Sequence, residues 1–135
     1  MPVTSPAILD DVKGGIARIS MTYVVDVATM PFREDSNRRV QRLIHATTVG
    51  AKDGFAMGIV EYTSDEFGEP DLHQDHESLY VLEGHGVARL GSEEYHLSPG
   101  LCLYIPAGTP HSIVKRGSSP VRLIFARSGR RTTQE

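Results

Sequence analysis

The chain has 135 residues, a length at which one domain with a single core is expected. Hydrophobic residues make up 39% of it and charged residues 23%, a composition typical of a globular protein and not of a disordered one. The net charge of −3 does not favour binding to nucleic acid, and no run of about 18 apolar residues is present to span a membrane.

Cysteine usage and the N-terminal sequence bear on the compartment. Cys102 is the only cysteine, so a disulfide framework within the chain is excluded. No basic segment followed by an apolar stretch opens the chain, and we therefore expect a cytoplasmic protein. Because Cys102 lies in the apolar run LCLYI, we interpret it as a small buried side chain and not as a nucleophile.

Short segments rich in Val, Ile, Leu and Tyr follow one another along the chain, separated by turns rich in Gly, Pro, Asp and Ser. The predicted strands are residues 23–27, 39–47, 55–62, 78–82, 86–90, 94–97, 101–105, 111–115 and 121–126. The best helix candidate, residues 6–19, is interrupted by Gly14 and Gly15, so no convincing helix is expected. Many short strands with regular turns predict an all-β sandwich or barrel.

Three regions are expected along the chain. Residues 1–35 form an N-terminal extension, partly strand, which is a candidate arm for dimerisation. Residues 36–127 form the barrel, and residues 128–135 form a polar C-terminal tail.

The residues that indicate chemistry lie between Gly68 and His111. His73 and Glu77 are four positions apart, so in an extended segment their side chains lie on the same side, whereas His76 faces the other way. Two imidazoles and one carboxylate are common ligands of transition metals. The pattern therefore predicts a metal held by His73, Glu77 and His111.

Two segments resemble the conserved motifs of the cupin superfamily. Segment 77–84, ESLYVLEG, is similar to the second half of the first motif, a Glu followed by six residues and a Gly. Segment 100–111, GLCLYIPAGTPH, fits the second motif, with Gly, Pro, Gly and His at fixed spacing. The resemblance covers about residues 39–127 and implies a double-stranded β-helix, or jelly-roll, with a metal between its sheets. Within it, Gly84 is expected to turn one strand into the next through a tight hairpin, and Gly108 to bend the chain back toward His111.

The first motif departs from the family pattern at one ligand position. The family carries two histidines, one residue apart, shortly before the Glu; the second corresponds to His73, but the first falls on Asp71. The resemblance therefore implies either four ligands, Asp71, His73, Glu77 and His111, or three ligands with Asp71 as a bystander or a catalytic base. A third alternative is that His76 replaces the missing histidine.

Other polar residues have simpler interpretations. The remaining histidines, His45, His85 and His96, are expected to be exposed. Arg42, Arg89 and Arg122 lie on predicted strands, and an arginine that pointed into the barrel would bind a carboxylate or phosphate group of a substrate.

The resemblance implies a metal-dependent enzyme acting on a small polar or anionic molecule. The cofactor would be one divalent transition metal, Mn, Fe, Co, Ni or Zn, serving as a Lewis acid or as a site for O₂. Isomerases or epimerases, dioxygenases, decarboxylases and lyases are all compatible with it. The alternative is a non-catalytic cupin that binds or senses a small ligand, with a degenerate or structural metal site. In either case we expect a homodimer, because an exposed sheet edge or apolar outer face favours association.

Overall fold

A computed structural model describes residues 8–13, 16–20 and 22–128 of the chain. Its strands are β1 (Ile8–Lys13), β2 (Ile16–Ser20), β3 (Arg33–Glu34), β4 (Arg38–Ile44), β5 (Ala56–Tyr62), β6 (Glu77–Glu83), β7 (Gly86–Leu90), β8 (Glu93–Leu97), β9 (Cys102–Ile105), β10 (His111–Lys115) and β11 (Val121–Arg127). Two short helices accompany them, η1 (Val27–Thr29) and α1 (Ala46–Val49). Neither of these described helices is long enough to cross a membrane.

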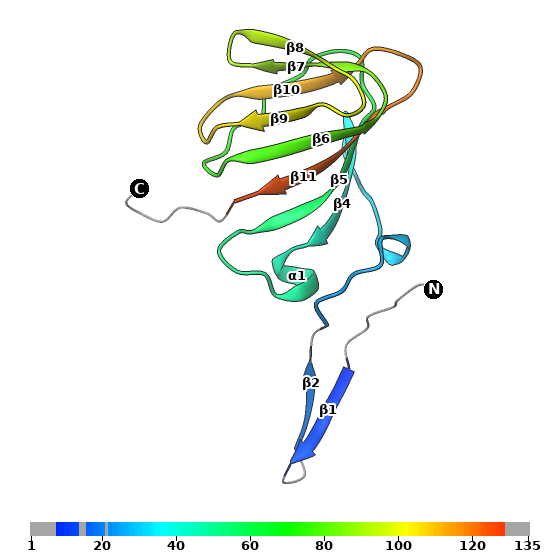
Figure 1. Cartoon of the computed structure of the whole chain (residues 1–135), viewed down its shortest axis with the longest axis vertical. Coiled ribbons are helices and arrows are strands. Elements are labelled where there is room, and N and C mark those ends of the chain that lie inside the picture. The colour runs from blue at the N-terminus through cyan, green and yellow to red at the C-terminus, as the bar shows by residue number, and fades with distance from the viewer. Residues whose placement is uncertain (1–7, 14–15, 21, 129–135) are drawn as a thin grey trace.

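Two antiparallel sheets form the barrel (Figure 1). The larger sheet has the strand order β3-β4-β5-β11-β6-β9, and the smaller has the order β10-β7-β8. Alternate residues of both sheets point inward and form one apolar core, which includes Val60, Leu79, Val81, Ala88, Ile113, Leu123 and Phe125. This is the all-β jelly-roll that the sequence predicted.

The start of the chain differs from its prediction in one place. No convincing helix was expected at residues 6–19, and this segment instead overlaps β1 and β2, which pair antiparallel and project away from the barrel (Figure 1). The predicted strand at residues 23–27 is wrong, because the Asp26 carboxylate accepts a hydrogen bond from the Ala28 N–H and starts η1. The buried amide of Gln41 then donates to the Val27 and Met30 carbonyls, at 3.1 and 2.9 Å, and holds this segment against β4.

The predicted strand at residues 39–47 is too long at its end. Strand β4 stops at Ile44, and α1 follows it, a short helix that the sequence did not predict. His45 begins this helix, because its Nδ1 accepts a hydrogen bond from the Thr47 N–H while the Thr48 hydroxyl accepts one from the His45 N–H.

The predicted hairpin at Gly84 is also wrong. Strand β6 belongs to the larger sheet and β7 to the smaller, so Gly84 carries the chain across from one sheet to the other. Its φ of 88° favours glycine, and a Cβ there would lie 2.2 Å from the Pro120 carbonyl oxygen. The close approach of another loop at this corner explains why a glycine stands here without a hairpin.

Cys102 was interpreted as buried, but it is exposed. Strand β9 lies at the edge of the larger sheet, where Ile105 and Leu103 occupy the inward positions. Cys102 and Tyr104 alternate with them and therefore point outward. An apolar run alone does not distinguish the two faces of an edge strand.

Candidate metal centre

His73, Glu77 and His111 converge at the inner face of the barrel. One ligand atom from each lies within 4.8 Å of the others, and this group could hold a metal ion. The Glu77 Oε1 atom is 3.2 Å from His73 Nε2 and 3.8 Å from His111 Nε2. Glu77 begins β6 and His111 begins β10, so the two sheets each contribute a ligand, and His111 is buried at 4% exposure. The three residues predicted from spacing are thus brought together.

His73 reaches this position from a loop and not from a strand. The prediction assumed an extended segment from His73 to Glu77, but β6 begins only at Glu77. The loop is fixed by the Gly108 N–H, which donates to the His73 carbonyl at 2.8 Å. Asp71 also exchanges two backbone hydrogen bonds with His111, at 2.7 and 3.0 Å. The second motif therefore holds the first in place through main-chain contacts.

The Nδ1 atoms of both histidines face protein acceptors. His111 Nδ1 lies 2.8 Å from the Thr109 carbonyl oxygen, and His73 Nδ1 lies 2.9 Å from the Asp75 carbonyl oxygen and 2.8 Å from its carboxylate. A neutral imidazole that donates from Nδ1 presents an unprotonated Nε2. Both rings are thus oriented to offer Nε2 toward Glu77, the arrangement that a metal requires.

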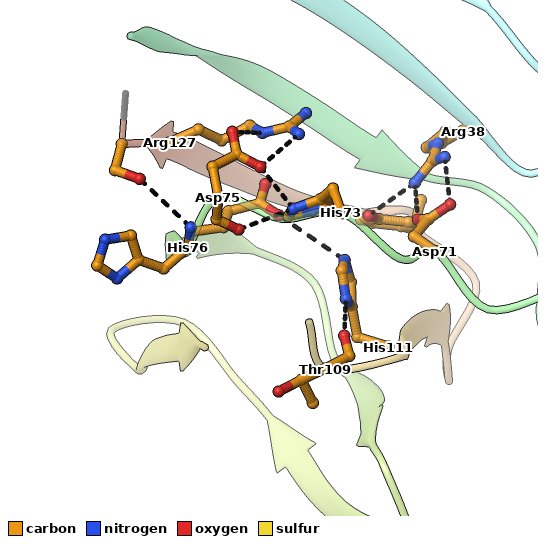
Figure 2. Close-up of polar contacts among 11 residues, drawn as sticks. Arg38, Asp71, His73, Asp75, His76, Thr109, His111 and Arg127 are labelled. Carbon is orange, nitrogen blue, oxygen red and sulfur yellow. Dashed lines mark hydrogen bonds and ion pairs between the residues drawn. The ribbon is translucent and has the colours of Figure 1, made fainter. Parts of the chain in front are cut away.

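Asp75 is a residue of this site that the sequence did not single out. Its carboxylate accepts hydrogen bonds from Arg127 at 3.1 and 3.0 Å, behind the His73 ring (Figure 2). Burial raises the pKa of Asp75, but the hydrogen bond and charge of Arg127 outweigh it, so the pKa lies below its ordinary value. The only available signal was its position two residues after His73.

Asp71, the predicted fourth ligand or base, forms a two-pronged ion pair with Arg38. The oxygens of its carboxylate lie 2.6 and 3.0 Å from the two terminal nitrogens of Arg38 (Figure 2). Burial raises the pKa of Asp71, but the hydrogen bond and charge of Arg38 lower it by more. The pKa therefore lies below its ordinary value, and the carboxylate is held in its charged form. It lies outside the group of three that could hold a metal. Its role as a ligand or base stays a prediction.

Tyr62 completes the polar contacts of Arg38. Its hydroxyl oxygen accepts a hydrogen bond from Arg38 at 3.2 Å. Burial raises the pKa of Tyr62 to about 12, so the phenol stays protonated and can still donate its own proton in a hydrogen bond.

The other histidines lie away from the three ligand atoms. His76, the alternative ligand, points away from His73 and His111 (Figure 2), and its Nδ1 lies 2.8 Å from the Tyr104 hydroxyl. His85 and His96 are exposed as expected and stack on each other, with 6.0 Å between ring centroids. His45 was expected to be exposed but is half-buried, because the α1 cap turns it toward the cavity.

A cavity of about 650 Å³ opens beside the three ligand atoms. Its charged lining residues are Arg33, Arg38, Arg42, Arg127, Asp71, Asp75 and Glu77, and its apolar lining residues include Val40, Phe55, Val60, Leu72 and Phe125. Arg42 is on the inner side of β4, on the same face as Val40. Arg89 and Arg122 pair instead with Glu94 and Glu61.

The donor set fits a divalent transition metal. Two ligand atoms that each lie about 2.1 Å from a metal are at most about 4.2 Å apart. The Glu77 Oε1 atom lies 3.2 and 3.8 Å from the two histidine Nε2 atoms, within this limit. Two imidazoles and a carboxylate suit Mn, Fe, Co, Ni or Zn, and three protein ligands leave coordination positions open toward the cavity. The site can therefore combine a metal with a bound small molecule.

A jelly-roll barrel with a two-histidine, one-carboxylate group inside it defines a cupin. The family model described as a cupin domain matches residues 58–127, and the chain belongs to this family. It is 30% identical over 98 residues to an uncharacterized protein of Methanocaldococcus jannaschii, covering 70% of this chain and 75% of that protein. It is 33% identical over 84 residues to the tetracenomycin polyketide synthase protein TcmJ of Streptomyces glaucescens, covering 62% of this chain and 56% of that protein.

Solved structures agree with this fold. The polyketide cyclase RemF of Streptomyces resistomycificus is 24% identical, with a TM-score of 0.65 over 83% of each chain. At this identity the likeness concerns the fold alone.

Proposed function

We propose that the chain is a metal-dependent enzyme that converts a small molecule in the barrel cavity. His73, Glu77 and His111 would hold one divalent transition metal. The observation that carries this proposal is the orientation of both imidazoles, whose Nδ1 atoms face protein acceptors while both Nε2 atoms face Glu77. Such bracing is characteristic of metal-ligating histidines.

Lewis-acid chemistry is the reaction type that the cavity supports best. A metal here would polarise an oxygen of the substrate and stabilise negative charge that develops on it. The cavity lining adds positive charge through Arg42, whose guanidinium no lining carboxylate neutralises, and Tyr62 can donate a hydrogen bond from a phenol that stays protonated. Positive charge in the cavity favours isomerase or lyase chemistry on an anionic substrate.

Asp71 has a supporting role in this proposal. Its two hydrogen bonds to Arg38 would have to break before its carboxylate could bind a metal. We infer a three-ligand set in which Asp71 positions Arg38 at the edge of the cavity. An Asp71→Asn variant that retains its metal would support this set over the four-ligand one.

The test is elemental analysis of the purified full-length chain beside a His73→Ala/His111→Ala variant. A matched control is His85→Ala/His96→Ala, which removes two exposed histidines elsewhere. We expect near-stoichiometric metal in the wild type and the control, and none in the site variant, with all three folded by circular dichroism. Wild-type protein that takes up no Mn, Fe, Co, Ni or Zn would refute the metal site.

The specific observation that favours a non-catalytic cupin is Asp71 itself, since it replaces a family histidine and is engaged by Arg38. Under this second proposal the metal is structural and the cavity only binds its ligand. Thermal stabilisation by a compound that the metal-loaded protein never converts would support the binding protein, whereas turnover that requires metal would support the enzyme.

A further inference from the structure

Arg42 differs from the other three arginines of the cavity in its contacts. Two of the cavity carboxylates are already paired, Asp71 with Arg38 and Asp75 with Arg127. Glu77 faces the two histidines. Among the residues that the structure describes, Arg42 has neither a hydrogen bond nor an ion pair from its side chain.

The surroundings of Arg42 are cationic. Arg42 is an exposed residue at the cavity, and its slight burial lowers its pKa first. The charges of Arg33 and Arg127 lower this pKa further, against a smaller opposing effect of Asp35. Arg33 has a partner of its own, since its guanidinium lies 3.8 Å from the Asp35 carboxylate. A free guanidinium among other cations, beside a site for a divalent metal, attracts an anion.

Two apolar side chains lie at the same cavity. Phe55 and Leu72 line it, yet their exposed fractions are 52% and 60%. They come from separate loops, one before β5 and the other before β6. Exposed apolar surface that lines a cavity favours a ligand with an apolar part.

We propose that Arg42 binds the carboxylate of an organic acid whose apolar part packs against Phe55 and Leu72. This names the substrate class of the cavity and rests on the proposed function. A guanidinium pairs with a carboxylate through two parallel hydrogen bonds, which one free arginine can supply. The acid is thereby held at the arginine, with the rest of the molecule free to extend toward the three ligand atoms.

The probes are 2-naphthoate, which has both an anionic group and a large apolar body, and acetate, which has only the first. Each is titrated calorimetrically into the full-length protein as purified, into Arg42→Ala and into Phe55→Ala. The matched control is Arg89→Ala, an exposed strand arginine on the other sheet, paired with Glu94. It removes the same charge from the chain without altering the cavity.

We expect 2-naphthoate to bind the wild type and Arg89→Ala with equal affinity. Its affinity for Arg42→Ala should be at least about tenfold lower, because a charge-assisted hydrogen bond is lost. Phe55→Ala should weaken 2-naphthoate but not acetate, and acetate should bind the wild type more weakly than 2-naphthoate. No binding of 2-naphthoate to the wild type, or equal binding to Arg42→Ala, overturns the proposal. Equal affinity of the wild type for both probes overturns the apolar half of it.

Metal content separates this inference from the proposed function. Arg42→Ala should keep the wild-type metal content, because Arg42 is not among the three ligand residues. If the wild type contains metal but 2-naphthoate binds the wild type and Arg42→Ala equally, only the carboxylate site is refuted. A wild type without metal that still binds 2-naphthoate through Arg42 would refute the metal enzyme and leave the carboxylate site standing.

Discussion

Asp75 and Arg127 are joined by two hydrogen bonds, 3.1 and 3.0 Å long, and the same Asp75 carboxylate lies 2.8 Å from the Nδ1 of His73. The arginine at the end of β11 thus fixes a carboxylate that in turn orients a candidate metal ligand. Arg127 would thus influence the proposed metal site only through Asp75.

Asp75→Asn should therefore lower metal affinity. Loss of the charged acceptor leaves the His73 ring less well oriented, and such a change typically costs about 10- to 100-fold in affinity. Competition with a chelator measures the effect, and Asp65→Asn, in an exposed loop, serves as the control. Equal metal affinity in the two variants would mean that the Asp75 contact does not support the ligand.

The ion pair of Asp71 with Arg38 should make stability depend on pH in the acid range. The pKa of Asp71 in the folded protein lies below the unfolded value of about 3.9. The ion pair therefore contributes its full stability above the unfolded pKa and loses it as the pH falls through the folded pKa. Asp71→Asn should cost about 1 to 3 kcal/mol at pH 7, where the charged hydrogen bonds are intact.

Urea unfolding at several pH values checks this. The difference in unfolding free energy between the wild type and Asp71→Asn should be constant from about pH 8 to 5 and shrink below about pH 4. Asp65→Asn should show no comparable loss. A difference that persists unchanged at pH 2 would mean that Asp71 stabilises the protein through something other than its charge.

Gly58→Ala should be strongly destabilising. A Cβ at Gly58 would lie 2.1 Å from the Gln41 carbonyl oxygen and 2.8 Å from the Phe125 ring, so strands β4 and β5 would have to separate. We expect a loss of about 2 kcal/mol or more in thermal or urea unfolding. Gly68→Ala is the matched control, because a Cβ there would meet no atom within 4 Å. Similar stability of both variants would show that the sheet yields easily at β4 and β5.

Cys102 should react in the folded protein. Because it is exposed on β9, a thiol reagent should label it fully without denaturant, and Cys102→Ser should change stability by less than about 0.5 kcal/mol. Labelling that requires denaturant would mean that another molecule covers this outer face, which also carries Tyr104 of β9 and Tyr80 of β6.

The predicted homodimer is tested by light scattering on the full-length chain. One chain has a mass of 14.8 kDa, and we expect the measured mass to be twice this value. An isolated two-stranded hairpin is only marginally stable in water, so β1 and β2 would gain stability by packing against a second copy. Removal of residues 1–21 should then weaken the dimer, whereas a full-length chain that stays monomeric would exclude the arm as a dimerisation element.

The fold and the convergence of His73, Glu77 and His111 could be predicted because the two segments that carry them match recognisable motifs with fixed internal spacing. Glu77 and His111 begin strands, and the Pro and Gly positions before His111 specify where that strand starts. Asp75 and Arg127 could not be paired in this way, since they are 52 positions apart and meet only when β11 lies beside β6. The sequence does not show which strand arginines form ion pairs. Arg42 therefore could not be distinguished from Arg89 and Arg122, which pair with Glu94 and Glu61.

The errors share a physical origin. The apolar run around Cys102 did not reveal that β9 is an edge, and the glycine at position 84 did not reveal that its neighbours belong to different sheets. Residues 23–27 read as a strand because no local pattern showed that Gln41 would bind their carbonyls. In each case a partner distant in the sequence decides the conformation.

The backbone bridge between Asp71 and His111 joins the two halves of the candidate site. The two hydrogen bonds join the segments that carry His73 and His111 and involve no side chain and no cation. These contacts therefore do not require an ion, and we expect the barrel to form in metal-free protein. If the proposed metal binds, it would be loaded into a site that the backbone has already assembled.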